Sequence, residues 1–263
     1  MNILTPVTKS PVTEAQVRQY HNDGFLVLRN LFSPVEAAEL QAEASRLLKR
    51  IDLIDINNIR CRWKNNVETD QCGFDCFDPV IDLSPLCARI VRDARILEAV
   101  GSLYGEPACL FKDKLIFKPP GAEGYALHQD YISWESFPAS FVTVILAVDA
   151  TSADNGATEV FPGYHKGGNI SPNDGQYHEL PLSAVDVSKG VRLDLEAGYI
   201  AIFSGFTPHR SAANQSKQWR RQLYLIYNSF SDGGEQRDEH YAEFKVWLQN
   251  RYAEYGKTNT YFR

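Results

Sequence analysis

Hydrophobic residues recur at helical spacing in the N-terminal part of the chain, and at strand spacing or in short apolar runs further on. The capping-type Thr13 predicts a helix over 13–20 that ends before Asn22-Asp23-Gly24, and a short strand is predicted at Phe25–Leu28. Ser33-Pro34 has the features of a helix start, and the apolar stripe that follows predicts a packing helix to Ile51. A largely helical N-terminal part is therefore expected, to about residue 105.

Between residues 52 and 82 the pattern becomes irregular, polar and aromatic, and this segment is a candidate to fold over a site. Ser84-Pro85 repeats the helix-start signal, and helical spacing returns over 86–104. Turn sequences then separate a series of predicted strands, at 109–111, 114–117, 141–148, 158–161, 191–193, 199–203 and 222–227. A final helix is predicted over about 238–254.

This order predicts a mainly β protein with flanking helices, in which the strands form a two-sheet antiparallel roll. No linker rich in Pro, Gly or Ser divides the chain, so we expect one domain over 1–263. Within it we expect a helical part at about 1–105, the roll at about 106–232 and the C-terminal helix at about 238–254.

Composition excludes some classes of function. The 263 residues carry 27 Lys and Arg against 33 Asp and Glu, and this acidic balance argues against nucleic-acid binding. We find neither a signal-peptide pattern nor an apolar run of the roughly 18 residues that span a bilayer, so a cytoplasmic protein without membrane contact is expected. The five cysteines are an odd number and are expected to be buried thiols.

His128 and Asp130 stand one residue apart, so on a strand both side chains point to the same face and can hold one metal ion. His209 follows a later strand and can supply a third ligand at the mouth of the roll. Two imidazoles and one carboxylate on one face of the metal are the ligand set of non-haem Fe(II) oxygenases. A His-x-Asp pair alone is more often a solvated turn, and the remaining pattern favours the metal site.

Arg220 lies eleven residues after His209 on the next predicted strand, where its planar guanidinium can bind a dicarboxylate. Thr143 lies on a predicted strand and is a candidate to touch a cosubstrate, with packing inside the roll as the alternative. Tyr131 and Trp134 follow the His-x-Asp motif as candidate walls of a substrate pocket, with packing at the rim as the alternative.

Four segments carry a resemblance to a known family: 22–31, 118–121 before the His-Gln-Asp motif, 154–167, and 209–216 followed by Arg220. Through them most of the chain resembles the phytanoyl-CoA dioxygenase (PhyH) family of Fe(II)- and 2-oxoglutarate-dependent oxygenases. The resemblance implies a double-stranded β-helix, the jelly roll of cupin-like proteins, with helices packed outside.

The resemblance also implies roles for individual residues. His128, Asp130 and His209 would be the ligands of Fe(II), while Arg220 and Ser211 would bind the distal carboxylate of 2-oxoglutarate. With dioxygen, such a site hydroxylates an unactivated carbon of a small molecule and releases succinate and carbon dioxide. A halogenating relative would need a small residue in place of Asp130.

The substrate depends on the loops and strands around the mouth. Arg60, Arg62, Lys112 and Lys114 can collect an anionic small molecule, with a solvated basic edge as the alternative. Within the family, this basic and aromatic surrounding favours an organophosphonate such as 2-aminoethylphosphonate, hydroxylated at its α-carbon. Hydroxylation of an amino acid, a natural-product intermediate or an acyl-CoA remains an alternative, as does a noncatalytic sensor of 2-oxoglutarate or metal.

Overall fold

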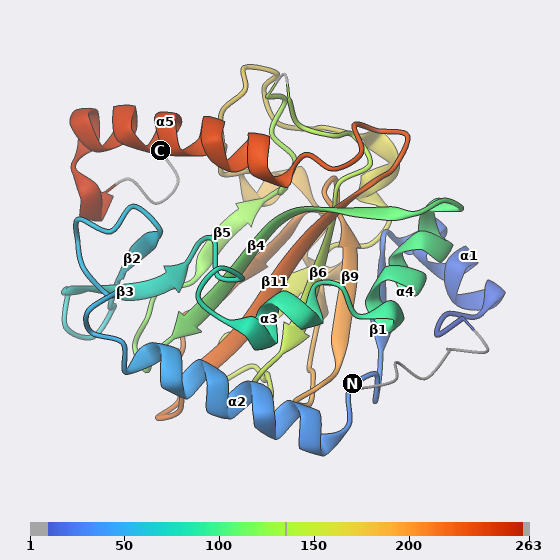
Figure 1. Cartoon of the computed structure of the whole chain (residues 1–263). Coiled ribbons are helices and arrows are strands. Elements are labelled where there is room, and N and C mark those ends of the chain that lie inside the picture. The colour runs from blue at the N-terminus through green and yellow to red at the C-terminus, as the bar shows by residue number, and fades with distance from the viewer. Residues whose placement is uncertain (1–9, 135, 260–263) are drawn as a thin grey trace.

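Two antiparallel sheets face each other in the computed structural model, which describes residues 10–134 and 136–259 (Figure 1). The larger sheet has seven strands in the order β1-β9-β6-β11-β4-β3-β2, and the smaller has four in the order β5-β10-β7-β8. The strands are β1 (Phe25–Leu28), β2 (Cys61–Asn65), β3 (Cys72–Phe77), β4 (Ala108–Lys118), β5 (Tyr125–His128), β6 (Val142–Ala147), β7 (Thr158–Val160), β8 (Val191–Arg192), β9 (Ile200–Ser204), β10 (His209–Ser211) and β11 (Arg220–Ser229).

The longer helices begin where the sequence places capping residues. The side chains of Thr13 and Ser33 each accept a hydrogen bond from the backbone N–H of the third residue of the helix. In return, the side chain of that third residue accepts from the backbone N–H of the cap residue, so two backbone donors at the helix start are satisfied. Gly24 ends the first helix with φ 81°, a left-handed backbone conformation that residues with a Cβ rarely adopt. The helices are α1 (Glu14–Asp23), α2 (Pro34–Leu48), α3 (Pro85–Ile90), α4 (Ala94–Tyr104) and α5 (Arg237–Tyr255), with short 3-10 turns at Tyr164–Gly167, Leu182–Ala184, Val187–Lys189 and Lys257–Asn259.

Helices α2, α3 and α4 cover the outer face of the seven-stranded sheet (Figure 1). On β6, Val144 and Leu146 join the core cluster that contains these helices, whereas Ile145 and Ala147 join the cluster on the inner side. Both faces of the central strands are therefore buried, and this explains why β6 is a continuous apolar run instead of an alternating one.

Strand β4, which β11 separates from β6, has polar residues on one face. Leu115 and Phe117 point to the helices, while Lys112, Lys114 and Lys118 share the opposite face because they are separated by even numbers of residues. Pairing with β11 sets Arg220 opposite Lys118 and continues residue by residue to Ile226 opposite Lys112, after which the register shifts. The β4–β11 pair thus carries a row of basic side chains on the inner face of the roll.

The predicted fold class is confirmed, with several differences in the elements. The irregular segment over 52–82 contains the hairpin β2–β3, which extends the larger sheet. The helix over 86–104 is two helices, because Asp93 adopts an extended conformation and caps the start of α4. Strands 109–111 and 114–117 form the single strand β4, and β5 and β10 were not predicted.

The C-terminal helix is confirmed, as α5, and lies across one end of the roll (Figure 1). Among residues 10–134 and 136–259, each helix is too short or too polar to cross a lipid bilayer.

Candidate active site

Strands β5 and β10 bring the two candidate histidines together. His209 is paired in register with His128, and their ring centroids lie 4.2 Å apart. The carboxylate Oδ1 of Asp130 lies 3.7 Å from His128 Nε2 and 3.6 Å from His209 Nε2. One ligand atom from each of the three residues falls within 4.8 Å of the others, so a single metal ion can be held between them.

Both histidines have the tautomer that a metal needs. His128 Nδ1 lies 2.7 Å from the carbonyl oxygen of Ala126, and His209 Nδ1 lies 3.0 Å from that of Thr207. A carbonyl only accepts, so each Nδ1–H donates and leaves the lone pair of Nε2 for the metal. Burial, and next the charge of His209, lower the pKa of His128 to about 3, and its ring is therefore neutral at physiological pH.

Asp130 does not lie on a strand, although its spacing from His128 predicts that the two residues share one strand face. β5 ends at His128, and Asp130 lies two residues beyond it. The intervening Gln129 fixes this turn: its amide donates to the carbonyl oxygens of Gly168 and Phe206, at 2.9 and 2.6 Å. The same turn therefore presents both side chains to the metal position without continuing the strand.

A threonine orients the carboxylate. Thr143 Oγ1 donates to Asp130 Oδ2 at 2.5 Å, which leaves Oδ1 facing the two imidazoles. Burial opposes ionisation, but the interactions of the carboxylate with His209 and Lys114 hold the pKa of Asp130 below its usual value. Thr143 was predicted from sequence to contact a cosubstrate, and in the structure it contacts the carboxylate of Asp130.

A small cavity adjoins the triad on the side of Ser211 and Tyr224. Arg220 is fully buried on β11, and its Nη1 donates at 2.6 Å to Gln222 Oε1, which also accepts from the Tyr224 hydroxyl at 3.2 Å. The other two guanidinium nitrogens, Nε and Nη2, are buried and have no partner among the described residues. Buried donors are normally satisfied, so two unused N–H groups fit a missing carboxylate, the group that 2-oxoglutarate supplies.

Lys118, which sequence reasoning did not select, lies beside this arginine. It is almost fully buried, donates to Ser211 Oγ at 3.2 Å and contacts the carbonyl oxygen of Ala212. Burial, and next the charge of Arg220, lower the pKa of Lys118 to about 6. In the free protein Lys118 is therefore largely neutral at physiological pH, and an anion bound beside Arg220 would favour its charged form.

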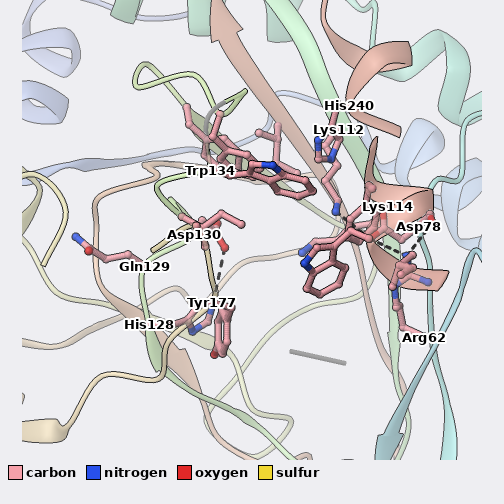
Figure 2. Close-up of a pocket in the computed structure, with 18 residues that line it drawn as sticks. Arg62, Asp78, Lys112, Lys114, His128, Gln129, Asp130, Trp134, Tyr177 and His240 are labelled. Carbon is pink, nitrogen blue, oxygen red and sulfur yellow. Dashed lines mark hydrogen bonds and ion pairs between the residues drawn. The ribbon is translucent and has the colours of Figure 1, made fainter. Parts of the chain in front are cut away.

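A second cavity of about 110 Å³ opens on the other side of His128 and Asp130. Four of the residues predicted from sequence to contact substrate line it: Arg62, Lys112, Lys114 and Trp134. Figure 2 shows the basic residues gathered on the side away from His128 and Asp130.

Two predicted residues are elsewhere. Arg60 binds Asp82 at 3.2 Å, and Tyr131 packs on Phe206 with ring centroids 4.6 Å apart; neither lines the cavity.

Several lining residues were not foreseen. Asp78 accepts from Lys112 at 3.1 Å and lies 3.7 Å from Arg62, so it holds both cations in place. The remaining wall is largely aromatic and includes Tyr177, His240, Phe244 and Trp247. The last three have i, i+4, i+7 spacing on α5, a stripe that the sequence contains and that marks one face of a helix.

Comparison with known proteins gives the same assignment as the geometry. The phytanoyl-CoA dioxygenase (PhyH) family profile matches residues 20–222. A methylphosphonate hydroxylase of Gimesia maris is 28% identical over 88% of this chain and 86% of its own length. A 2-aminoethylphosphonate dioxygenase of an uncultured bacterium is 26% identical over 86% and 85%, and an ectoine dioxygenase of Bordetella parapertussis is 28% identical over 82% and 75%.

The fold has solved counterparts. The crystal structure of EctD from S. alaskensis with 2-oxoglutarate and 5-hydroxyectoine superposes with a TM-score of 0.70, at 21% identity, over 89% of this chain and 83% of that one. The chain therefore belongs to the phytanoyl-CoA dioxygenase (PhyH) family and is an Fe(II)- and 2-oxoglutarate-dependent dioxygenase.

Proposed function

We propose that this dioxygenase hydroxylates the carbon next to phosphorus in a small organophosphonate, such as 2-aminoethylphosphonate. The observation that carries the proposal is the charge of the larger cavity. Arg62, Lys112 and Lys114 line it, whereas Asp78 is the one carboxylate among its described lining residues apart from the metal-facing Asp130. Three cations against one counter-ion leave an excess that suits a substrate with up to two negative charges.

The cations are held at fixed positions. Arg62 is 5% exposed and donates to the carbonyl oxygen of Ile59 at 2.6 Å, and the ammonium of Lys112 lies 3.7 Å from the ring centre of Phe244. Burial alone would lower the pKa of Lys114, but the carboxylates of Asp130 and Asp78 raise it above its usual value. A preorganised set of donors of this kind recognises a tetrahedral anion with little reordering.

The size of the cavity also favours a small metabolite. The cavity has a volume of about 110 Å³ and is walled by the aromatic side chains of Trp134, Phe137 and α5. A coenzyme A thioester would need a long channel and a larger anion-binding surface. Two relatives named for phosphonates agree with this choice, and the ectoine dioxygenases make a zwitterionic amino-acid derivative the alternative.

We assign the metal to His128, Asp130 and His209, and the distal carboxylate of 2-oxoglutarate to Arg220 and Ser211. When bound, iron and 2-oxoglutarate supply the oxidising power for hydroxylation, with release of succinate and carbon dioxide. The chain's own residues hold the reactants: Nε2 of each imidazole faces the metal position, and Lys114 lines both the smaller and the larger cavity. The substrate carbon is thereby kept on the side of the metal that the larger cavity opens to.

The test is turnover with Fe(II), 2-oxoglutarate and oxygen across methylphosphonate, 2-aminoethylphosphonate, ectoine, amino acids and acyl-CoA thioesters, with His128→Ala as background. Succinate reports coupled and uncoupled turnover, so the hydroxylated phosphonate is followed separately by phosphorus NMR. The carboxylate analogue β-alanine, which has the same backbone as 2-aminoethylphosphonate, tests the head group. Hydroxylation of β-alanine or ectoine, with the phosphonates untouched, would discard the proposed substrate.

Arg220→Met should raise the KM for 2-oxoglutarate by roughly 30-fold, because a hydrogen bond to a charged group contributes about 2 kcal/mol. The expectation rests on the two buried donors that the guanidinium leaves unused. Steady-state kinetics at saturating substrate measures the change, and Arg221→Met on the same strand, whose side chain pairs with Asp149 on the outer side, is the matched control. Unchanged 2-oxoglutarate dependence would remove Arg220 from the cosubstrate site.

Lys112→Met should raise the KM for the phosphonate about tenfold and leave the KM for 2-oxoglutarate unchanged, because it removes one charged donor from the larger cavity alone. Arg60→Met is the matched control, since it removes a cation that pairs with Asp82 outside the cavity. Equal effects of the two variants would indicate a general loss of positive potential instead of a direct contact.

A further inference from the structure

His240 is a buried imidazole that lacks hydrogen-bond partners. It lies in the first turn of α5, is 3% exposed and lines the larger cavity beside Lys112 (Figure 2). Both of its ring nitrogens are buried, and neither has a partner in the described part of the chain. Most buried polar side-chain atoms in proteins have at least one partner, so a ring with two unsatisfied nitrogens needs an explanation.

The packing around the ring does not require a histidine. Its nearest aromatic neighbours are Phe111, with centroids 4.3 Å apart, Tyr241 at 5.3 Å and Phe244, stacked at 5.6 Å. The hydroxyl of Tyr241 is engaged elsewhere, because it donates to Asp78 and to the carbonyl oxygen of Asp113. Benzene rings offer no conventional acceptor or donor in the plane of the imidazole, so phenylalanine would fill this position without leaving polar atoms unsatisfied. The chain thus retains a polar group at a cost in stability, a pattern that is found at functional sites.

Burial, and after it the surrounding charges, set the protonation state of His240. Lys112 on β4, Asp78 after β3 and Arg237 on α5 act on the ring. Burial, followed by the charge of Lys112, lowers the pKa of His240 to about 3. The free protein therefore presents a neutral imidazole, with one N–H donor and one lone pair, beside a fixed ammonium group.

We propose that His240 is a specificity-determining residue that donates a hydrogen bond to the anionic head group of the substrate, next to the ammonium of Lys112. This inference rests on the proposed function for the identity of the head group. The donor and Lys112 come from α5 and β4, so the head group would lie where the two elements meet, and the C-terminal helix becomes part of substrate recognition. The lone pair on the second nitrogen accepts from a protonated oxygen or an amine of the same molecule.

His240→Phe separates this role from a structural one. If the ring serves packing, the variant should be less stable; if its partner is the substrate, the variant without ligand should be as stable as wild type or more so. The KM for 2-aminoethylphosphonate or methylphosphonate should rise about tenfold or more, with the KM for 2-oxoglutarate unchanged. His240→Gln, which keeps a donor, should recover part of the loss, and His21→Phe removes an exposed histidine on α1 as the matched control.

Binding is measured on protein loaded with Fe(II) and 2-oxoglutarate without oxygen, by calorimetric titration of both phosphonates and by the melting temperature before and after ligand addition. Wild-type binding together with equal binding by His240→Phe would overturn the role of His240 and leave the proposed function intact. Absence of binding by wild type would overturn the proposed function and this inference with it. If His240→Phe does not fold, His240→Gln and His240→Leu decide by the same comparison of KM and melting temperature.

Discussion

Replacing His209 by alanine should lower kcat for succinate formation about 1000-fold or more, while the protein stays folded. The three ligand atoms lie within 4.8 Å of one another, and two remaining ligands cannot keep the metal in this geometry. Changes to residues that only orient a ligand typically cost 10- to 100-fold in metal affinity or activity, so loss of the ligand itself should exceed that range. Turnover with saturating 2-oxoglutarate, and iron content after gel filtration, measure the two consequences.

Thr143→Val provides the graded comparison. Its hydroxyl donates to Asp130 Oδ2 and is fully buried, so valine should keep the packing and lose the orientation of the carboxylate. We expect an activity loss of roughly 10- to 100-fold, smaller than that of His209→Ala. If His209→Ala retains wild-type activity at controlled iron, the assigned triad is wrong; if Thr143→Val loses as much as His209→Ala, Thr143 does more than orient Asp130.

The clustering of His128, Asp130 and His209 could be predicted from the sequence, because two of the three residues stand close together in the chain. One residue separates His128 from Asp130, and His209 precedes Arg220 by eleven residues. The reason given for the first pair was only partly right, since β5 ends at His128 and Gln129 holds the turn that presents Asp130. A His-x-Asp motif requires only that both side chains reach the same metal position. Several backbone conformations, including a turn, satisfy that requirement.

The lining of the larger cavity could be predicted only in part, because its walls come from segments far apart in the chain. Residues Lys112 and Lys114 were identified through their spacing on one strand, whereas the partners of Arg60 and Arg62 depend on a hairpin that the polar sequence of 52–82 concealed. Asp82 draws Arg60 away from the cavity, and Asp78 holds Arg62 in it. Such ion-pair choices require three-dimensional proximity that no local pattern contains.

The same limit applies to the C-terminal helix, whose existence was predicted and whose role was not. His240, Phe244 and Trp247 form a stripe on α5, but an aromatic stripe on a helix is ordinarily core packing. In the structure the stripe lines the larger cavity, so the helix both buries apolar surface and supplies a wall of the cavity that His128 and Asp130 also line. What holds α5 in place should therefore affect both stability and substrate binding.

Arg237→Ala should destabilise the protein by about 3 kcal/mol, the lower end of the cost of leaving a buried charge without its partner. Arg237 Nε donates at 2.6 Å to Asp113, which is fully buried on β4 and also accepts from the backbone N–H groups of Val80 and Ile81. This ion pair joins the first turn of α5 to the strand that carries Lys112. Denaturant unfolding measures the loss, and Arg18→Ala, which breaks an exposed pair on α1, should change stability by less than about 0.5 kcal/mol.

The variant also tests whether α5 belongs to the substrate cavity. Since the helix contributes residues to the larger cavity and none to the smaller, its loosening should raise the KM for substrate much more than the KM for 2-oxoglutarate. Assays are run well below the unfolding temperature of the variant, so that the comparison reports on folded protein. A destabilised Arg237→Ala enzyme with both KM values unchanged would mean that α5 stabilises the roll without shaping the site. A selective rise in the substrate KM would link one buried ion pair, through the position of a single helix, to recognition of the substrate.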